Sequence, residues 1–226
     1  MRRWLGHALA IALKDLRRES RTRDYLVGKL VLALLMLLAF AFAFDVGGEH
    51  VRRAAPGILW ITLIFSGMLG SGMAFSSESE NGLLEGLILA PVDRGAIYAG
   101  KFLGILALMV GVEAVVLPTF ASFFNLPAIS LSVIAPVLIG SVGFSAVATL
   151  FAAVAANTRT REVLLPVLLL PTVTPLIISG VRATDLGLGG PAVGDGLPWL
   201  QLTAVVGAIY AGVSLLVVDQ VLEEME

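Results

Sequence analysis

The chain has 226 residues, of which 58 % are hydrophobic and only 14 % are charged, and its mean hydropathy is +0.93. Average soluble domains carry about 25 % charged residues, so this composition excludes a water-soluble fold and an intrinsically disordered chain. The formal net charge of −2 gives no general attraction to nucleic acid, and the absence of cysteine removes disulfides, thiolate metal sites and thiol nucleophiles.

The amino-terminal residues 3–24 are predicted to form a cytoplasmic amphipathic helix that lies along the membrane surface. Such helices bury an apolar stripe among the lipid headgroups and attract anionic lipid with basic residues. The helix could anchor the topology or help to move the first span. The apolar stripe consists of Trp4, Leu5, Ala8, Ile11, Ala12 and Leu16, and the basic face of Arg3, His7, Lys14, Arg17, Arg18 and Arg21.

The lengths of the apolar runs predict six membrane-spanning helices. A spanning helix needs about 20 apolar residues, because ~30 Å of hydrocarbon is crossed at ~1.5 Å per residue. The runs are too continuous for a β-barrel. The 45 uncharged residues between Glu113 and Arg159 must contain a reversal, for which residues 124–127 carry the best turn signal. The predicted spans are 26–44, 57–75, 98–119, 130–155, 163–181 and 198–218, and the fold class is an all-α polytopic membrane protein with one transmembrane domain, residues 1–226.

The distribution of Lys and Arg predicts that both termini face the cytoplasm. Of the 15 basic residues, only Arg52, Arg53 and Arg182 fall in loops on the opposite side. Lys29, near the start of the first span, is expected to extend its ammonium group to the membrane surface. The three tryptophans Trp4, Trp60 and Trp199 lie near predicted span ends and are expected to be interfacial anchors.

The cytoplasmic segment 77–91, between the second and third spans, is predicted to be a short exposed helix. Ser77 followed by Glu80 has the form of a capping box, and Pro91 stops the helix. A helix of about two turns is marginal alone, so it must pack against the span ends or insert into a groove on a soluble partner. Its apolar stripe consists of Leu83, Leu84, Leu87 and Ile88.

The same segment carries a resemblance to a known class of transporters. Residues 80–91, Glu-Asn-Gly-Leu-Leu-Glu-Gly-Leu-Ile-Leu-Ala-Pro, resemble the E-x-G-x-L-E-x-L-x-x-x-P pattern of ABC-2-type permeases. In that class the segment couples the membrane domain to a separate ATPase subunit. The resemblance therefore implies ATPase-coupling roles for Glu80, Gly82, Leu83, Leu84, Glu85, Leu87, Ile88 and Pro91.

More narrowly, the chain resembles the haem exporter protein B (CcmB) family of cytochrome c maturation. The resemblance is collinear over almost the whole chain and includes Lys14-Asp15-Leu16-Arg17-Arg18-Glu19, Ala55-Pro56-Gly57-Ile58-Leu59-Trp60, Lys101 and the proline-studded run from Leu164 to Ile178. It implies a permease of the cytoplasmic (inner) membrane that delivers or exports haem, or releases a haem chaperone. The implied partners are an ABC ATPase subunit that binds ATP, a haem-handling membrane protein and a periplasmic haem chaperone.

The chain is not expected to be an enzyme. It has no G-x-x-x-x-G-K-[ST] loop for nucleotide phosphates, no metal-ligand cluster and no catalytic constellation, so we expect no cofactor on this chain and haem only as cargo. Six spans are few, and a homodimer is therefore expected. The alternatives are an ABC-2 permease for a lipid, drug or polysaccharide, an ion-coupled carrier that uses Glu113, and a non-transporting membrane scaffold.

Within the spans, three sets of residues stand out. Glu113 is the one acid deep in an apolar run, and because a charge at mid-bilayer costs roughly 2.5–3.5 kcal/mol, it is expected to form a structural hydrogen bond, line a substrate path or relay protons. Pro166, Pro171 and Pro175 interrupt the fifth span and could form a hinge. Small residues that allow close helix packing, or line a dimer interface, are Ser66, Gly67, Gly70, Ser71, Gly140 and Gly143.

Overall fold

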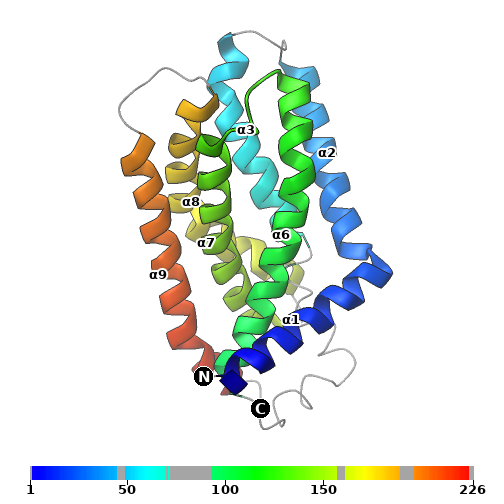
Figure 1. The fold of residues 1–226 in the computed structure, drawn as a ribbon, viewed down its shortest axis with the longest axis vertical. Coiled ribbons are helices and arrows are strands. Elements are labelled where there is room, and N and C mark those ends of the chain that lie inside the picture. The colour runs from blue at the N-terminus through cyan, green and yellow to red at the C-terminus, as the bar shows by residue number, and fades with distance from the viewer. Residues whose placement is uncertain are drawn as a thin grey trace.

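The computed structural model describes residues 2–44, 49–69, 71, 93–156, 161–188 and 196–223. These residues form seven α-helices and one 3-10 turn, and none of them lies in a strand. Figure 1 shows long helices gathered into a bundle, with α1 lying obliquely across one end. The elements are α1 (Arg2–Thr22), α2 (Asp24–Ala43), α3 (Glu49–Met68), α6 (Arg94–Phe124), α7 (Leu131–Ala156), α8 (Arg161–Asp185), the 3-10 turn η1 (Leu186–Leu188) and α9 (Gly196–Glu223).

Five of these helices, α2, α6, α7, α8 and α9, are long and apolar enough to cross a membrane. They coincide with five of the six predicted spans, which confirms a multi-pass all-α membrane protein. The described part of α3 is not among the five, because Arg52 and Arg53 lie near its start and it ends at Met68. The rest of the predicted span 57–75 lies mostly outside the described residues, so the sixth span stays a prediction.

Helix α7 is the centre of the bundle and packs against α6, α8 and α9. Most of its residues are buried, and most of the buried ones are Gly, Ala, Ser or Thr, which allows its neighbours to approach closely. The outer helices instead direct apolar residues away from the bundle at intervals of three or four positions, as expected for surfaces that face lipid. These exposed residues include Val27, Val31, Leu35, Leu38 and Phe42 of α2, and Leu202, Val205, Ile209, Val213 and Leu216 of α9.

The reversal between α6 and α7 occurs where the turn signal predicted it. Asn125 adopts a left-handed conformation with φ 50° and ψ 48°, and its backbone N–H donates to the carbonyl oxygen of Ala121. Asparagine tolerates this conformation better than most residues, so it ends the helix at Phe124 at little steric cost.

The apolar stripe of α1 does not lie as the sequence pattern predicted. Ala8, Ile11 and Ala12 are buried inside the protein, and α1 packs extensively against α6. Of the predicted stripe only Leu5 is exposed, and it lies in a second row with Leu9 and Leu13, each about half exposed. The helix therefore has two apolar faces, and the prediction that Ala8, Ile11 and Ala12 face lipid was wrong because one of these faces is occupied by another helix.

The prediction that Trp60 is an interfacial anchor was also wrong. Trp60 is buried, and its indole N–H donates to the hydroxyl oxygen of Thr184 at 3.3 Å. A Cβ atom placed on Gly140 of α7 or on Gly180 of α8 would lie 2.1 Å or 2.2 Å from the Trp60 ring. The ring therefore packs between α7 and α8. Any side chain larger than that of glycine at position 140 or 180 would overlap it.

Candidate functional site

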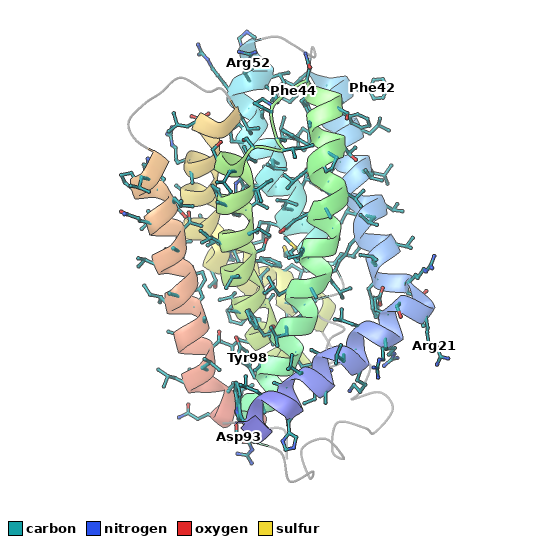
Figure 2. The ribbon with its side chains drawn as sticks, viewed as in Figure 1. Arg21, Phe42, Phe44, Arg52, Asp93 and Tyr98 are labelled. Atoms are coloured by element: carbon teal, nitrogen blue, oxygen red, sulfur yellow. The ribbon has the colours of Figure 1, made fainter. Side chains whose placement is uncertain are left out.

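The predicted ATPase-coupling segment, residues 77–91, lies outside the described residues together with all eight of its candidate side chains, and so does Gly70. Asp93, the first described residue after this segment, is the N-cap of α6. Figure 2 places Asp93 and Tyr98 at the end of the bundle that α1 crosses, and Arg52 and Phe44 at the opposite end. The described part of the candidate site is therefore the junction between α1 and the start of α6.

An ion pair holds this junction together. The ammonium nitrogen of Lys101 lies 3.0 Å from a carboxylate oxygen of Asp15, and only 2 % of the Lys101 side chain is exposed, against 26 % for Asp15. A charge that is this well buried needs a partner, because an unpaired ion loses its hydration without compensation. Removing one member of a buried pair typically costs about 3–5 kcal/mol, so the Asp15–Lys101 pair strongly favours α1 in its observed place.

Close backbone contact surrounds the ion pair. A Cβ atom on Gly100 would lie 2.7 Å from the Cβ of Ile11 and 2.8 Å from the carbonyl oxygen of Ala8, so only glycine lets α1 approach α6 this closely. At the amino end of α1, the indole N–H of Trp4 donates to a carboxylate oxygen of Asp93 at 3.1 Å. The same oxygen caps α6 by accepting from the backbone N–H of Ala96 at 3.3 Å.

The other end of α1 is tied to α2. The carboxylate of Glu19, only 5 % exposed, accepts from the backbone N–H of Leu26 at 2.6 Å. Lys29 is 1 % exposed and interacts electrostatically with Glu19, so its ammonium group does not extend to the surface as predicted. A single residue between the helices, Arg23, adopts a left-handed conformation with φ 59°, which makes the corner between α1 and α2 sharp.

A second buried polar contact lies within the bundle. Glu113 of α6 is 1 % exposed, and the hydroxyl of Ser141 of α7 donates to its Oε1 atom. Among the described residues, no hydrogen-bond partner reaches Oε2. The arrangement is one interhelical hydrogen bond with an open acid oxygen, which is compatible with a structural contact, a path residue or a proton relay.

Three of the small residues singled out in the sequence, Gly67, Gly140 and Gly143, lie at contacts between helices of this chain. A Cβ atom on Gly67 would lie 2.7 Å from the ring of Phe144, and one on Gly143 would lie 2.7 Å from the Cα of Gly207. The hydroxyls of Ser66 and Ser71, both buried, donate to backbone carbonyl oxygens of Leu63 and Gly67. Gly140 receives the Trp60 ring as described above. Gly67, Gly140 and Gly143 therefore contribute to packing within one protomer.

Helix α8 is continuous from Arg161 to Asp185, although Pro166, Pro171 and Pro175 lie within it. Pro171 and Pro175 are exposed and Pro166 is half-buried. Each proline removes one backbone donor from the helix. In addition, the hydroxyl of Tyr210 of α9 donates to the carbonyl oxygen of Thr172, which ties the proline-rich stretch to its neighbour.

The sequence pattern did not reveal the Asp15–Lys101 pair. It also did not reveal Gly180, which lies against the Trp60 ring, or Gly207, which lies against Gly143. A signal for the ion pair was present, since Asp15 is an acid on a strongly basic helix and Lys101 is a cation within an apolar run. Nothing in the pattern matched the two to each other. Among the residues that the structure describes, no group of three or more His, Cys, Asp and Glu could hold a metal ion.

Comparison with known proteins gives consistent matches over most of the chain. The family described as CcmB protein matches residues 6–219. Heme exporter protein B of Paracoccus denitrificans is 31 % identical over 187 residues, which cover 80 % of this chain and 84 % of that protein. Heme exporter protein B of Rhodobacter capsulatus is 30 % identical over 204 residues, covering 89 % and 92 %. The protein of the same name from Escherichia coli K12 is 26 % identical over 208 residues, covering 89 % and 90 %.

Proposed function

The chain belongs to the CcmB protein family, and on this premise we propose that it is the membrane permease subunit of an ABC transporter that exports haem for cytochrome c maturation. The observation that carries the proposal is the family match over residues 6–219. In addition, the matches to relatives named heme exporter protein B cover most of the length of those relatives. Five long apolar helices fit a permease of the inner membrane.

Energy is supplied by a separate ATPase subunit in this proposal. The sequence has no phosphate-binding loop of its own, and the segment 77–91 carries the coupling pattern of ABC-2-type permeases. Residues 77–91 would insert the apolar stripe from Leu83 to Ile88 into a groove on the ATPase. Movement of the ATPase would then reach the spans through Asp93 and α6, the first described elements after that segment.

The proposed topology has six spans, with α1 at the cytoplasmic membrane surface and both termini in the cytoplasm. Two features support it: α1 and the carboxyl-terminal end of α9 lie at the same end of the bundle, and Arg52 lies at the opposite end (Figures 1 and 2). The basic residues of α1 and the outward row Leu5, Leu9 and Leu13 suit a surface rich in anionic lipid.

The assembly would contain two copies of this chain and two ATPase subunits. A haem-handling membrane protein and a periplasmic haem chaperone complete the set of proposed partners. Haem is cargo in this proposal and ATP binds the partner subunit, so the chain itself holds no cofactor.

The partner assignment can be tested by purifying the chain in mild detergent and identifying the bound proteins by mass spectrometry. The expected result is an ABC ATPase that co-purifies with the unmodified chain but is lost, by at least tenfold, in the double variant Leu84→Asp and Leu87→Asp. Two buried carboxylates in an apolar groove would each be desolvated without a partner. Membrane insertion of the variant is expected to be normal.

Leu89→Asp is the matched control, because Leu89 lies in the same segment but off the predicted apolar stripe. It introduces the same side chain and should retain the ATPase. Retention of the ATPase by the Leu84 and Leu87 double variant would show that this segment is not the docking element.

A further inference from the structure

We infer that α1 is a rigid strut that makes the amino ends of α2 and α6 move together during transport, and that Asp15 and Lys101 are the positioning residues that hold it. The inference rests on the proposed function and deepens it. It assigns to α1 a mechanical role in passing movement from the ATPase side of α6 to the first span, in addition to contact with lipid.

The α1–α6 end of the strut is fixed by three separate contacts over about three helical turns. Trp4 bonds Asp93 at 3.1 Å, Ile11 and Ala8 lie against Gly100, and Asp15 pairs with the buried ammonium group of Lys101 at 3.0 Å. Contacts at three levels along a helix prevent it from pivoting. A helix that only floated in the headgroups would need none of them, and would not bury Ala8 and Ile11 in protein.

The α1–α2 end of the strut is fixed as well. Glu19 is buried, accepts from the backbone N–H of Leu26 in the first turn of α2, and interacts with the buried Lys29. Only Arg23 separates the two helices, and its backbone N–H donates to the carbonyl oxygen of Glu19 at 2.6 Å. With so short a connection and a buried polar contact across it, α2 must follow a displacement of α1.

Movement enters this unit at the start of α6. Only Val92 separates the proposed docking segment 77–91 from Asp93 and Arg94, so a push on that segment displaces the amino end of α6. Because α1 is joined to α6 by a buried ion pair and to α2 by Glu19, the same push displaces α2. The ion pair should therefore stay closed throughout the transport cycle.

A disulfide placed at the junction tests whether α1 and α6 stay joined. The chain contains no cysteine, and a Cβ atom on Gly104 would lie 3.8 Å from the Cβ of Asp15, which equals the mean Cβ–Cβ distance of about 3.8 Å in disulfides. The double variant Asp15→Cys and Gly104→Cys removes the ion pair and allows a covalent bond in its place. The complete complex with its ATPase is reconstituted in vesicles and assayed for ATP-dependent haem movement, before and after oxidation with diamide.

The expected result is that Asp15→Cys alone reduces transport at least fivefold under both conditions. The double variant should be equally impaired when reduced and should return to within about twofold of the unmodified rate when oxidised. The rate of disulfide formation should be the same with and without ATP. Lys14→Met is the matched control: it removes an exposed partner of the same carboxylate, 3.4 Å away, and should leave transport unchanged.

Three results would overturn the inference. The first is full transport by Asp15→Cys, and the second is transport by the double variant that oxidation blocks and reduction restores. The third is a rate of disulfide formation that falls when ATP is present. If Asp15→Cys does not accumulate in the membrane, Asp15→Asn takes its place, and undiminished transport by that variant would also overturn it. Failure of the proposed function is seen separately, as the absence of ATP-dependent haem movement by the unmodified complex, and the cross-linking rates remain informative in that case.

Discussion

Glu113 shows how much a single polar side chain can determine inside an apolar bundle. Its Oε1 atom accepts from the hydroxyl of Ser141, so the carboxyl group links α6 to α7 inside the bundle. The Oε2 atom has no partner among the described residues, which fits either a structural or a functional role. A structural contact needs only the acceptor at Oε1, whereas a proton relay or a path residue needs the acidic group itself.

We predict that Glu113→Gln retains transport within about twofold, because the amide oxygen can still accept from Ser141. Glu113→Leu should lower the free energy of unfolding by about 1–3 kcal/mol, since it leaves a buried hydroxyl without its acceptor. The measurements are ATP-dependent haem movement in vesicles and thermal unfolding in detergent. Complete loss of transport by Glu113→Gln at normal expression would instead assign Glu113 to a path or a relay.

At the scale of helices, the packing of α3, α7 and α8 depends on one large side chain, that of Trp60, and on two glycines that leave room for it. Trp60 occupies the space over Gly140 and Gly180, and its indole N–H reaches Thr184. Lipid chains are as apolar as leucine, so the hydrophobic effect does little to hold membrane helices together. Close packing and interhelical hydrogen bonds must do so, and the Trp60 wedge supplies both.

We predict that Gly140→Ala destabilises the bundle by about 1–3 kcal/mol, because the new methyl group would overlap the Trp60 ring and force a rearrangement of the core. The measurement is the midpoint of thermal unfolding in detergent. Gly212→Ala in α9 is the matched control, since a Cβ atom there meets nothing within 4 Å, and it should be neutral or slightly stabilising. Equal midpoints for the two variants would contradict the wedge.

At the scale of the whole molecule, three of the four buried charged residues in the described part of the chain lie at the junctions of α1, and apolar surface covers the sides. The junctions of α1 with α6 and α2 contain the described ion pairs and the buried charges Glu19, Lys29 and Lys101. The outward apolar rows of α2 and α9 are long enough to face lipid or a second copy of the chain. The molecule thus has paired charges at one end and sides suited to a bilayer.

We predict that the chain is a homodimer in the membrane, because the six predicted spans would make a small permease. Two differently tagged copies are produced in the same cells, and one tag is captured after extraction in mild detergent. The second tag should co-purify in comparable amount. Extracts of separately produced copies, mixed after solubilisation, should not exchange, and capture of one tag alone together with the ATPase would contradict the dimer.

The sequence alone determined the elements that depend on local properties of the chain. Uncharged run length located α2, α6, α7, α8 and α9, and the residues around Asn125 located the turn between α6 and α7. The CcmB family was also identified from the order of its motifs along the chain. Hydropathy and turn preference act over one helix or one turn, so they can be read without knowledge of the rest of the molecule.

Only the tertiary structure decided which faces of these helices meet. It placed Ala8 and Ile11 of α1 against Gly100, paired Asp15 with Lys101, and set Trp60 between α7 and α8. The physical reason is that an apolar residue in a membrane is equally well accommodated by lipid and by protein. Hydrophobicity therefore cannot tell a lipid-facing stripe from a packed one, and the difference arises only when segments distant in sequence bring a glycine, a charge or a ring to the same place.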